Sequence, residues 1–172
     1  EDRRESLRAI EAEADRMSRI VNDLLLLAEI DSGQTETKER VSLGNVLLEE
    51  YERAAKLAVG HRISIVHQED VTVEGNPQRL KQMLGNLLDN AIKYTPDGGT
   101  ISLSLYRDGQ WARIDVSDTG IGISAEHLPH LFDRFYRVDA ARSRTTGGGT
   151  GLGLAIVKSI AEQHGGKVAV TS

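Results

Sequence analysis

Three polar side chains, Asn86, Asn90 and Lys93, are the first residues of this chain whose types and spacing could do chemistry. Offsets of four and three residues return to one face of a helix. Two carboxamides and an ammonium on one stripe suit a metal-bound, multiply charged ligand. The aromatic ring of the adjacent Tyr94 could stack on a flat ring of such a ligand. Taken alone, the segment is more typical of a solvated stripe on an ordinary amphipathic helix, because polar stripes are common.

A second group of residues, Asp118-Thr-Gly120-Ile-Gly122, directly follows a segment that alternates apolar and polar residues as far as Ser117. A carboxylate at the end of a strand can accept a hydrogen bond from an exocyclic amine of a ligand. Two nearby glycines, which lack a Cβ, would let a ligand ring approach the backbone. The alternative is a tight turn with a capping aspartate, because glycine and aspartate are also common turn residues.

The third group is the run Gly147-Gly-Gly-Thr-Gly151-Leu-Gly153-Leu154, which leads straight into an apolar helical pattern. Glycines before a helix leave backbone N–H groups free to face an anion, and the helix N-terminus adds a partial positive charge. The run is neither a P-loop nor a dinucleotide fingerprint, because it lacks Gly-Lys-Ser/Thr and no G-x-G-x-x-G after a strand can be placed there. A flexible glycine linker is the alternative, although linkers do not run directly into an apolar helix.

Aromatic and cationic residues lie between the two glycine-rich groups. The segment LFDRFYRVD, residues 131–139, holds both phenylalanines of the chain and could anchor the base of a loop to the core. The polar and cationic stretch 134–149 is typical of a lid or a disordered loop. Guanidinium groups at Arg137, Arg142 and Arg144 could reach a phosphate chain, or they could be solvated charges beside a small apolar cluster.

Composition narrows the class of protein. A chain of 172 residues with 39% hydrophobic residues suits one domain plus an accessory element, and 4% aromatic residues imply an aliphatic core. A net charge of -5 argues against a general nucleic-acid binder. The chain has no cysteine, no signal peptide and no apolar run of the ~20 residues that span a bilayer. We therefore expect no membrane contact by this segment and a cytoplasmic location, with a membrane anchor possible in a longer parent protein.

The elements that must position these groups follow from periodicity. Asn76 is a good N-cap, Pro77 suits a first helical turn, and apolar residues then recur at three- and four-residue intervals as far as Tyr94. The same reasoning predicts further helices over residues 41–59, 125–132 and 152–164, and strands over residues 62–67, 71–74, 100–106, 111–116 and 167–171. This order predicts an α+β sandwich with helices on one face of a mixed β-sheet.

The first thirty residues form a separate element. Seven apolar residues spaced by three and then four positions give a heptad seam: Leu7, Ile10, Ala14, Met17, Val21, Leu24 and Ala28. Such a seam predicts a long helix that pairs with another helix, from a second chain or from sequence before Glu1. A helix folded back on its own domain is the alternative. We expect one unit over residues 1–33, a linker over residues 34–40 and a second unit over residues 41–172.

With these motifs in order, the chain resembles the sensor histidine kinases of two-component signalling. NLLDNAIKYT is similar to the family's asparagine box, DTGIGIS to its first glycine box, LFDRFYRVD to its phenylalanine box and GGGTGLGLAI to its second glycine box. Residues 16–33 are similar, with a weaker motif, to the second helix of the family's dimerisation and histidine-phosphotransfer domain. The resemblance implies a Bergerat-type ATP-binding fold over residues 41–172.

The resemblance also implies roles for individual residues. Asn90, with Asn86 close by, would hold the Mg²⁺ that bridges the phosphates of ATP. Lys93 and Arg137 would face the phosphates, Tyr94 the adenine ring, and Asp118 the adenine amino group. The remaining residues implied to line the nucleotide site come from the two glycine boxes: Gly120, Gly122, Ile123, Gly149, Thr150, Gly151, Leu152 and Gly153.

One departure from the family and one comparison with its ATPase relatives refine the resemblance. In the family, the phospho-accepting histidine lies on a first helix, in a conserved box with an acidic residue beside it. None of the five histidines of this chain has that context, so we expect the acceptor upstream of Glu1. In ATP-hydrolysing relatives of this fold, a glutamate four residues before the magnesium asparagine activates water. Asn86 occupies that position here and cannot act as a base, which favours a kinase over an ATPase.

The sequence thus predicts the catalytic domain of a sensor histidine kinase that moves the γ-phosphoryl group of Mg-ATP to a histidine outside this chain. The expected partners are a response regulator and a second copy of the parent protein, which we expect in the bacterial inner membrane. A module that binds nucleotide without phosphorylating is the alternative. A purely structural coiled-coil adaptor would leave the glycine-rich groups unexplained.

Overall fold

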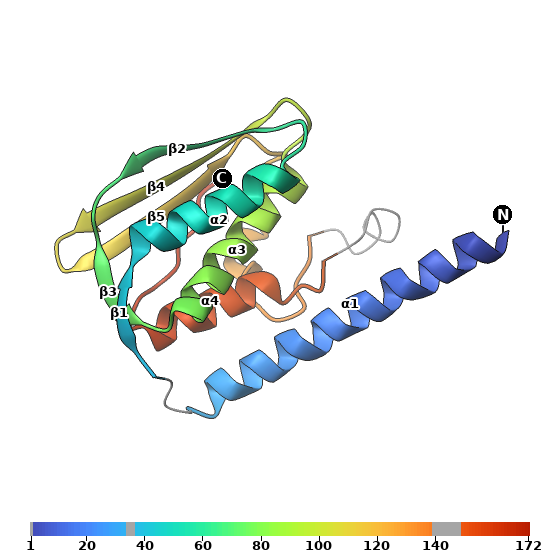
Figure 1. Cartoon of the computed structure of the whole chain (residues 1–172), viewed down its shortest axis with the longest axis horizontal. Helices are drawn as coiled ribbons and strands as arrows, with labels where there is room; N and C mark the ends of the chain where they lie inside the picture. Colours follow the sequence, from blue (N-terminus) through green and yellow to red (C-terminus); the bar gives the residue numbers. More distant parts are fainter. Residues whose placement is uncertain (1, 34–36, 139–148) are drawn as a thin grey trace.

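The computed structural model describes residues 2–33, 37–138 and 149–172 of the chain (Figure 1). Its elements, in order, are helix α1 (Asp2–Asp31), strand β1 (Glu39–Ser42), helix α2 (Leu43–Leu57), strands β2 (Arg62–Gln68) and β3 (Thr72–Gly75), helix α3 (Pro77–Tyr94), strands β4 (Thr100–Asp108) and β5 (Trp111–Asp118), the short 3-10 helix η1 (Leu128–His130) and helix α4 (Gly153–Gln163). None of the helices in these ranges combines the length and the hydropathy that a bilayer crossing requires.

A mixed three-stranded sheet carries the core. β4 lies in the middle, parallel to β2 and antiparallel to β5, while β1 and β3 form a separate antiparallel pair. Ile101, Leu103 and Leu105 alternate along β4, so all three point to the same face and are fully buried. They pack with apolar residues of α2 and α3, so the helices cover this face of the sheet. The predicted α+β sandwich with a mixed sheet is confirmed.

Helix α3 begins where the sequence predicts. The side chain of Asn76 accepts hydrogen bonds from the backbone N–H groups of Gln78 and Arg79, at 3.0 and 3.2 Å, and thereby satisfies two donors that the first turn leaves free. Leu80, Leu84 and Leu88 are buried in the core between helix and sheet. Because this apolar face is fixed against the sheet, the neighbouring stripe of α3 has a fixed direction too.

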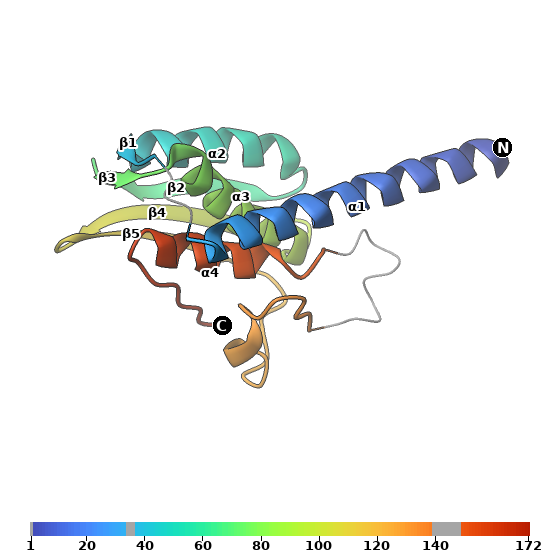
Figure 2. The ribbon, with the colours of Figure 1, turned by 90° about the horizontal axis from the view of Figure 1, so that it is seen from below.

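Among the described residues, helix α1 packs against the rest of the chain through its last turns, and its first turns project well beyond the other elements (Figures 1 and 2). Leu26 and Leu27 are buried in a second apolar cluster with Leu152, Ile156 and Ile160 near and within α4. The folded-back arrangement, our alternative, is therefore present, but through a different face from the heptad seam. Seam residues Leu7, Ile10, Met17, Val21 and Leu24 remain 40% to 65% exposed.

Three sequence predictions of secondary structure need correction. Residues 39–42 form β1, so the strand takes up two residues expected in the linker and the following helix begins at Leu43 rather than Val41. Residues 125–132 form only the three-residue η1. Residues 167–171 form no strand, because alternation is a local signal whereas a strand needs a hydrogen-bonded neighbour. The predicted lid falls mostly on residues 139–148, which lie outside the described residues.

The packing of α1 can be tested with two leucines of one helix. Leu27 is 1% exposed and Leu25 is 57% exposed. We expect Leu27→Ala to lower the free energy of opening α1, measured by amide hydrogen exchange over residues 20–31, by about 2–5 kcal/mol, because it leaves a cavity. Leu25→Ala is the control and should change it by about 0.5 kcal/mol or less. Equal effects would show that α1 does not dock through Leu27.

Candidate functional site

The polar stripe of α3, which carries Asn86, Asn90 and Lys93, lies against the residues at the start of α4. Asn86 donates a hydrogen bond from Nδ2 to the backbone oxygen of Gly153, at 3.2 Å. A Cβ added to Gly153 would lie 3.7 Å from the Asn86 side chain, and one added to Gly149 would lie 3.2 Å from Lys93 Nζ. The Asn86 carboxamide and the Lys93 ammonium of α3 therefore lie directly against the glycine-rich segment 149–153, although Asn86 and Gly153 are 67 residues apart in sequence.

The C-terminal end of α3 also contacts the turn after β5. The backbone N–H of Ile121 donates to the backbone oxygen of Tyr94, at 3.2 Å. A Cβ added to Gly120 would lie 2.7 Å from the same oxygen, so a residue with a side chain cannot sit there without a shift. Tyr94 is 48% exposed, and the ammonium of Lys93 lies 5.2 Å from the centre of its ring. The end of α3, with Lys93 and Tyr94, is thus in direct contact with the predicted Asp118–Gly122 turn.

Asp118 ends β5 with its side chain exposed. Its Oδ1 accepts a hydrogen bond from the backbone N–H of Gly120, at 2.8 Å, which fixes the carboxylate beside the turn. Further along the turn, Gly122 has a φ of 72°, and the N–H of Ile123 donates to Ser172 Oγ at 2.7 Å. The aspartate is therefore positioned by its own turn, with its second oxygen free of that contact.

The segment before α4 is built around Thr150 and Gly151. Thr150 Oγ1 accepts the N–H of Leu152 at 3.2 Å, and Gly151 has a φ of 76°. The N–H of Phe135 donates to the oxygen of Gly151 at 2.9 Å, and Phe135 itself has a φ of 65°, which is rare for a residue with a side chain. The phenylalanine segment and the glycine segment are thus locked together. The Leu152 side chain is fully buried in the cluster with α1, so only its backbone can face a ligand.

Two of the predicted residues are less connected. Asn90 is half-buried on α3, one turn after Asn86 and on the same stripe. Among the described residues, Arg137 makes none of the hydrogen bonds or ion pairs that join the other candidates. Arg142 and Arg144 lie outside the described residues.

The oxygen donors of α3 fit a magnesium ion. Because a backbone carbonyl only accepts, the hydrogen bond to Gly153 fixes the orientation of the Asn86 amide and leaves its Oδ1 free for another partner. Asn90 offers a second carboxamide oxygen on the same stripe. Mg²⁺ prefers oxygen ligands and keeps several waters, so one or two such groups together with phosphates suffice.

Sequence reasoning missed two residues of α1 that touch this region. Asp23 Oδ2 accepts a hydrogen bond from Thr150 Oγ1 at 3.2 Å, and Asp31 accepts two from Arg134 at 2.9 and 2.7 Å. Burial raises the pKa of Asp23 above its usual range, while the Thr150 hydrogen bond and the nearby Arg19 oppose the rise. No signal in the sequence points to these contacts, because a single aspartate on a highly charged helix forms no pattern.

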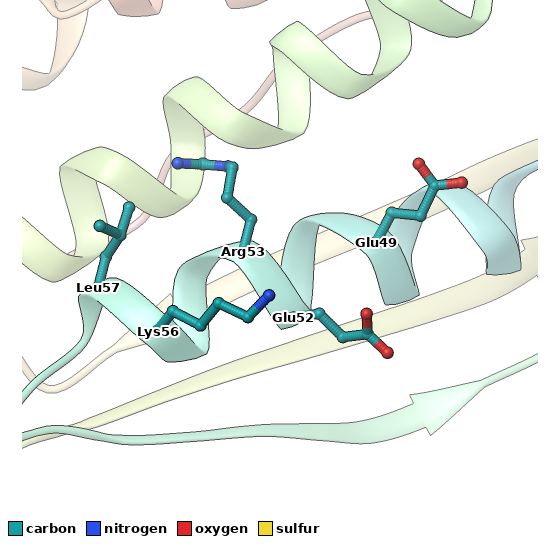
Figure 3. A pocket seen from close by; sticks show the side chains of 5 residues that line it. All are labelled: Glu49, Glu52, Arg53, Lys56 and Leu57. Carbon is teal, nitrogen blue, oxygen red and sulfur yellow. The ribbon is translucent and has the colours of Figure 1, made fainter.

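A shallow hollow on α2 does not belong to the site. Its lining comes entirely from α2: Glu49, Glu52, Arg53, Lys56 and Leu57 (Figure 3). Arg53 points across to α3, where it donates to Gly85 O at 3.3 Å and to Asp89 Oδ1 at 2.9 Å. These contacts tie α2 to α3, so we interpret the hollow as part of the helix packing.

Comparison with known families agrees with this arrangement. The family model described as histidine kinase-, DNA gyrase B- and HSP90-like ATPase matches residues 75–172, more than half of the chain. A second model, the His Kinase A (phospho-acceptor) domain, matches residues 1–33. The two matches cover the glycine-rich site and the long helix respectively.

Individual proteins give the same result. The chain is 40% identical over 170 residues to the phosphate regulon sensor protein PhoR of Pseudomonas aeruginosa, covering 97% of this chain and 38% of that protein. It is 41% identical over 162 residues to the sensor histidine kinase CusS of Escherichia coli K12, covering 93% of this chain and 34% of that protein. It therefore spans only a little over a third of these relatives.

Solved structures show the same likeness in three dimensions. The full-length ShkA structure in complex with AMPPNP has a TM-score of 0.83 and 28% identity, covering all of this chain and 36% of that one. The mycobacterial sensor histidine kinase MprB has a TM-score of 0.65 and 30% identity, covering 74% and 80%. The chain belongs to the family of histidine kinase-, DNA gyrase B- and HSP90-like ATPases, as the catalytic domain of a two-component sensor histidine kinase.

The close approach at Gly151 gives a stability prediction. A Cβ there would lie 2.9 Å from the Phe135 backbone, whereas one at Gly98, which has a φ of 84°, would meet nothing within 4 Å. We expect Gly98→Ala to cost about 1–2 kcal/mol for the left-handed backbone alone. Gly151→Ala should cost more in urea unfolding, because it also pushes the phenylalanine segment away. Equal costs would contradict the contact.

Proposed function

We propose that this chain binds Mg-ATP and transfers its γ-phosphoryl group to a histidine outside the chain. The observation that supports this most directly is the hydrogen bond from Asn86 to Gly153, which holds a carboxamide-bearing helix against a glycine turn. That pairing suits a bound polyphosphate, because carboxamide oxygens can ligate its metal ion while free N–H groups face its oxygens. An adaptor with no ligand would not need it.

Each residue then has a role. Asn90 and Asn86 hold the Mg²⁺, which when bound neutralises charge between the phosphates and favours transfer. Lys93 and Arg137 bind the phosphates, and Tyr94 stacks on the adenine. Asp118 accepts a hydrogen bond from the adenine amino group through the oxygen that Gly120 leaves free. The glycine boxes line the nucleotide: Gly120, Gly122, Ile123, Gly149, Thr150, Gly151, Leu152 and Gly153.

The nucleophile distinguishes a kinase from an ATPase. A water-activating base four residues before Asn90 would have to be Asn86, whose amide is held to Gly153 and cannot accept a proton. Phosphoryl transfer needs mostly positioning and charge neutralisation, so the site can work with a nucleophile brought by another helix. The acceptor is a histidine of the parent protein, and the phosphoryl group then passes to an aspartate of a response regulator.

The parent protein extends beyond this chain in the same proposal. Residues 1–33 are the second helix of its dimerisation and phosphotransfer domain, residues 34–38 the linker and residues 39–172 the ATP-binding domain. The exposed seam of α1 supports a homodimer, because apolar side chains at 40% to 65% exposure are available to a partner helix. We place the parent in the bacterial inner membrane with this part in the cytoplasm.

The experiment supplies the family's histidine-bearing helix as a separate protein together with Mg-ATP. We expect acid-labile, base-stable phosphate on that protein when the chain is present. Asn90→Ala should abolish the transfer and lower Mg-dependent ATP affinity about tenfold or more, about 1.4 kcal/mol, because it removes a metal ligand. Gln78→Ala, an exposed residue of the same helix, is the control. Nucleotide binding without transfer would instead support a purely regulatory module.

The role of Asp118 can be tested through base preference. We expect Asp118→Asn to lower the preference for ATP over GTP about tenfold, measured as a ratio of dissociation constants by calorimetry. A carboxamide whose oxygen accepts from Gly120 presents its NH₂ to the ligand, which suits the guanine carbonyl and repels the adenine amine. Asp97→Asn, at an exposed turn residue, should leave the ratio unchanged. An unchanged ratio in Asp118→Asn would remove this role.

A further inference from the structure

Polar contacts join α3 and α4 at both ends of α4. At its start, Asn86 Nδ2 donates to Gly153 O at 3.2 Å. At its end, the backbone N–H of Asn76 donates to His164 Nε2 at 3.1 Å. The stretches from Asn76 to Asn86 and from Gly153 to His164 both rise by about 15–17 Å, at ~1.5 Å per residue. The two helices therefore run past each other in opposite directions, with matched lengths between the two contacts (Figure 1).

Hydrogen bonding assigns one neutral tautomer to His164. Its Nδ1 lies 2.8 Å from the backbone oxygen of Ile160, and because a carbonyl oxygen only accepts, Nδ1 carries the proton. Its Nε2 faces the N–H of Asn76, which only donates, so Nε2 presents its lone pair. The ring therefore has one donor and one acceptor, and both are used.

The glycine before Asn76 makes room for this ring. A Cβ added to Gly75 would lie 2.6 Å from His164 Cδ2 and 2.7 Å from His164 Nε2. The φ of Gly75 lies outside the left-handed region, so the backbone itself does not require a glycine there. The close approach of the half-buried ring does require one. The ring is thus held at the residue whose side chain caps α3.

Between the two contacts the interface is apolar. Met83 of α3 packs against the cluster that contains Ile156 and Ile160 of α4. Burial of apolar surface holds the helices together, but it is non-directional and does not by itself select one position of α4 along α3. Two hydrogen bonds at opposite ends of α4 do so, because the first fixes a point and the second fixes the direction.

We infer that His164 is a positioning residue of the nucleotide site. By holding the end of α4 at Asn76, it keeps Gly153 within reach of Asn86 at the other end. The inference rests on the proposed function and adds to it a residue at the far end of α4. A shift of α4 along α3 would break the contact that orients the Asn86 amide, and groups that orient a metal ligand contribute to metal affinity.

The tautomer can be measured without any ligand. Proton–nitrogen correlation NMR of the isotope-labelled chain distinguishes a protonated from an unprotonated ring nitrogen, and His164→Gln identifies the His164 signals by their loss. At about pH 8, where an ordinary histidine is neutral, we expect Nδ1 to be protonated and Nε2 to be unprotonated. The opposite tautomer, or a mixture of the two, would overturn the inference.

Two substitutions test the consequence for the site. His164→Gln places an amide oxygen near the position of Nε2 and can still accept from Asn76, whereas His164→Asn is shorter and keeps only a donor for Ile160. Calorimetry gives the ADP affinity with Mg²⁺ and with excess EDTA, and the ratio of the two isolates the metal-dependent part. We expect His164→Asn to lower this ratio about threefold or more and to shift the NMR signals of the Asn86 side-chain amide. His164→Gln should keep most of the ratio.

A loss of stability alone should not have this effect. Val71→Ala, at a position 3% exposed in the main core, is the control and should leave both the ratio and the Asn86 signals unchanged. Unmoved Asn86 signals in His164→Asn, equal ratios in the two His164 variants, or an equal fall in Val71→Ala would overturn the positioning role. No binding of millimolar Mg-ADP by the unsubstituted chain would overturn the proposed function instead, while the Asn86 signals would still decide the role of His164.

Discussion

Helix α3 packs one face into the sheet, and the rest of the site depends on that packing. Leu80, Leu84 and Leu88 fix the rotation of the helix about its own axis. The stripe that carries Asn86, Asn90 and Lys93 then has one direction available, towards the start of α4. A rotation of α3 that moved Asn86 away from Gly153 would also pull leucines out of the core. The site is therefore held rigid by apolar packing rather than by its own polar contacts.

Small residues make the second half of the site possible. Gly120 lies so close to the Tyr94 carbonyl, and Gly151 so close to the Phe135 backbone, that a side chain at either position would force segments apart. The chain accepts an unusual backbone at Phe135, with a φ of 65° and a cost of about 1–3 kcal/mol, next to this contact. Three segments distant in sequence can therefore meet over a short distance, which leaves N–H groups and one carboxylate oxygen at a common surface.

Helix α1 has two apolar faces with different uses. Leu26 and Leu27 are buried against α4, while the heptad seam stays exposed along the projecting turns. Periodicity predicted the long helix correctly. It could not show that the last turns pack on the ATP-binding unit, because Leu26 and Leu27 appear in the sequence only as part of a crowded apolar run. The ion pairs of Glu29 and Asp31 were hidden for the same reason, since single charges on a charged helix carry no pattern.

The sequence by itself determined the helices and strands with strong periodicity, the cap at Asn76, the fold class and the residue types of the site, because these follow from local spacing and from motifs read in order. Prediction from local alternation failed where hydrogen bonding to a neighbouring strand decides the outcome. Residues 39–42, which were not predicted as a strand, pair with β3, whereas residues 167–171, which were predicted as a strand, form none. Only the tertiary structure decided that Asn86 meets Gly153, that the Leu152 side chain faces α1, and that Asp23 touches Thr150. The first and last of these contacts join residues 67 and 127 positions apart in the chain. Contacts over such separations depend on how the elements pack, which no short stretch of sequence encodes.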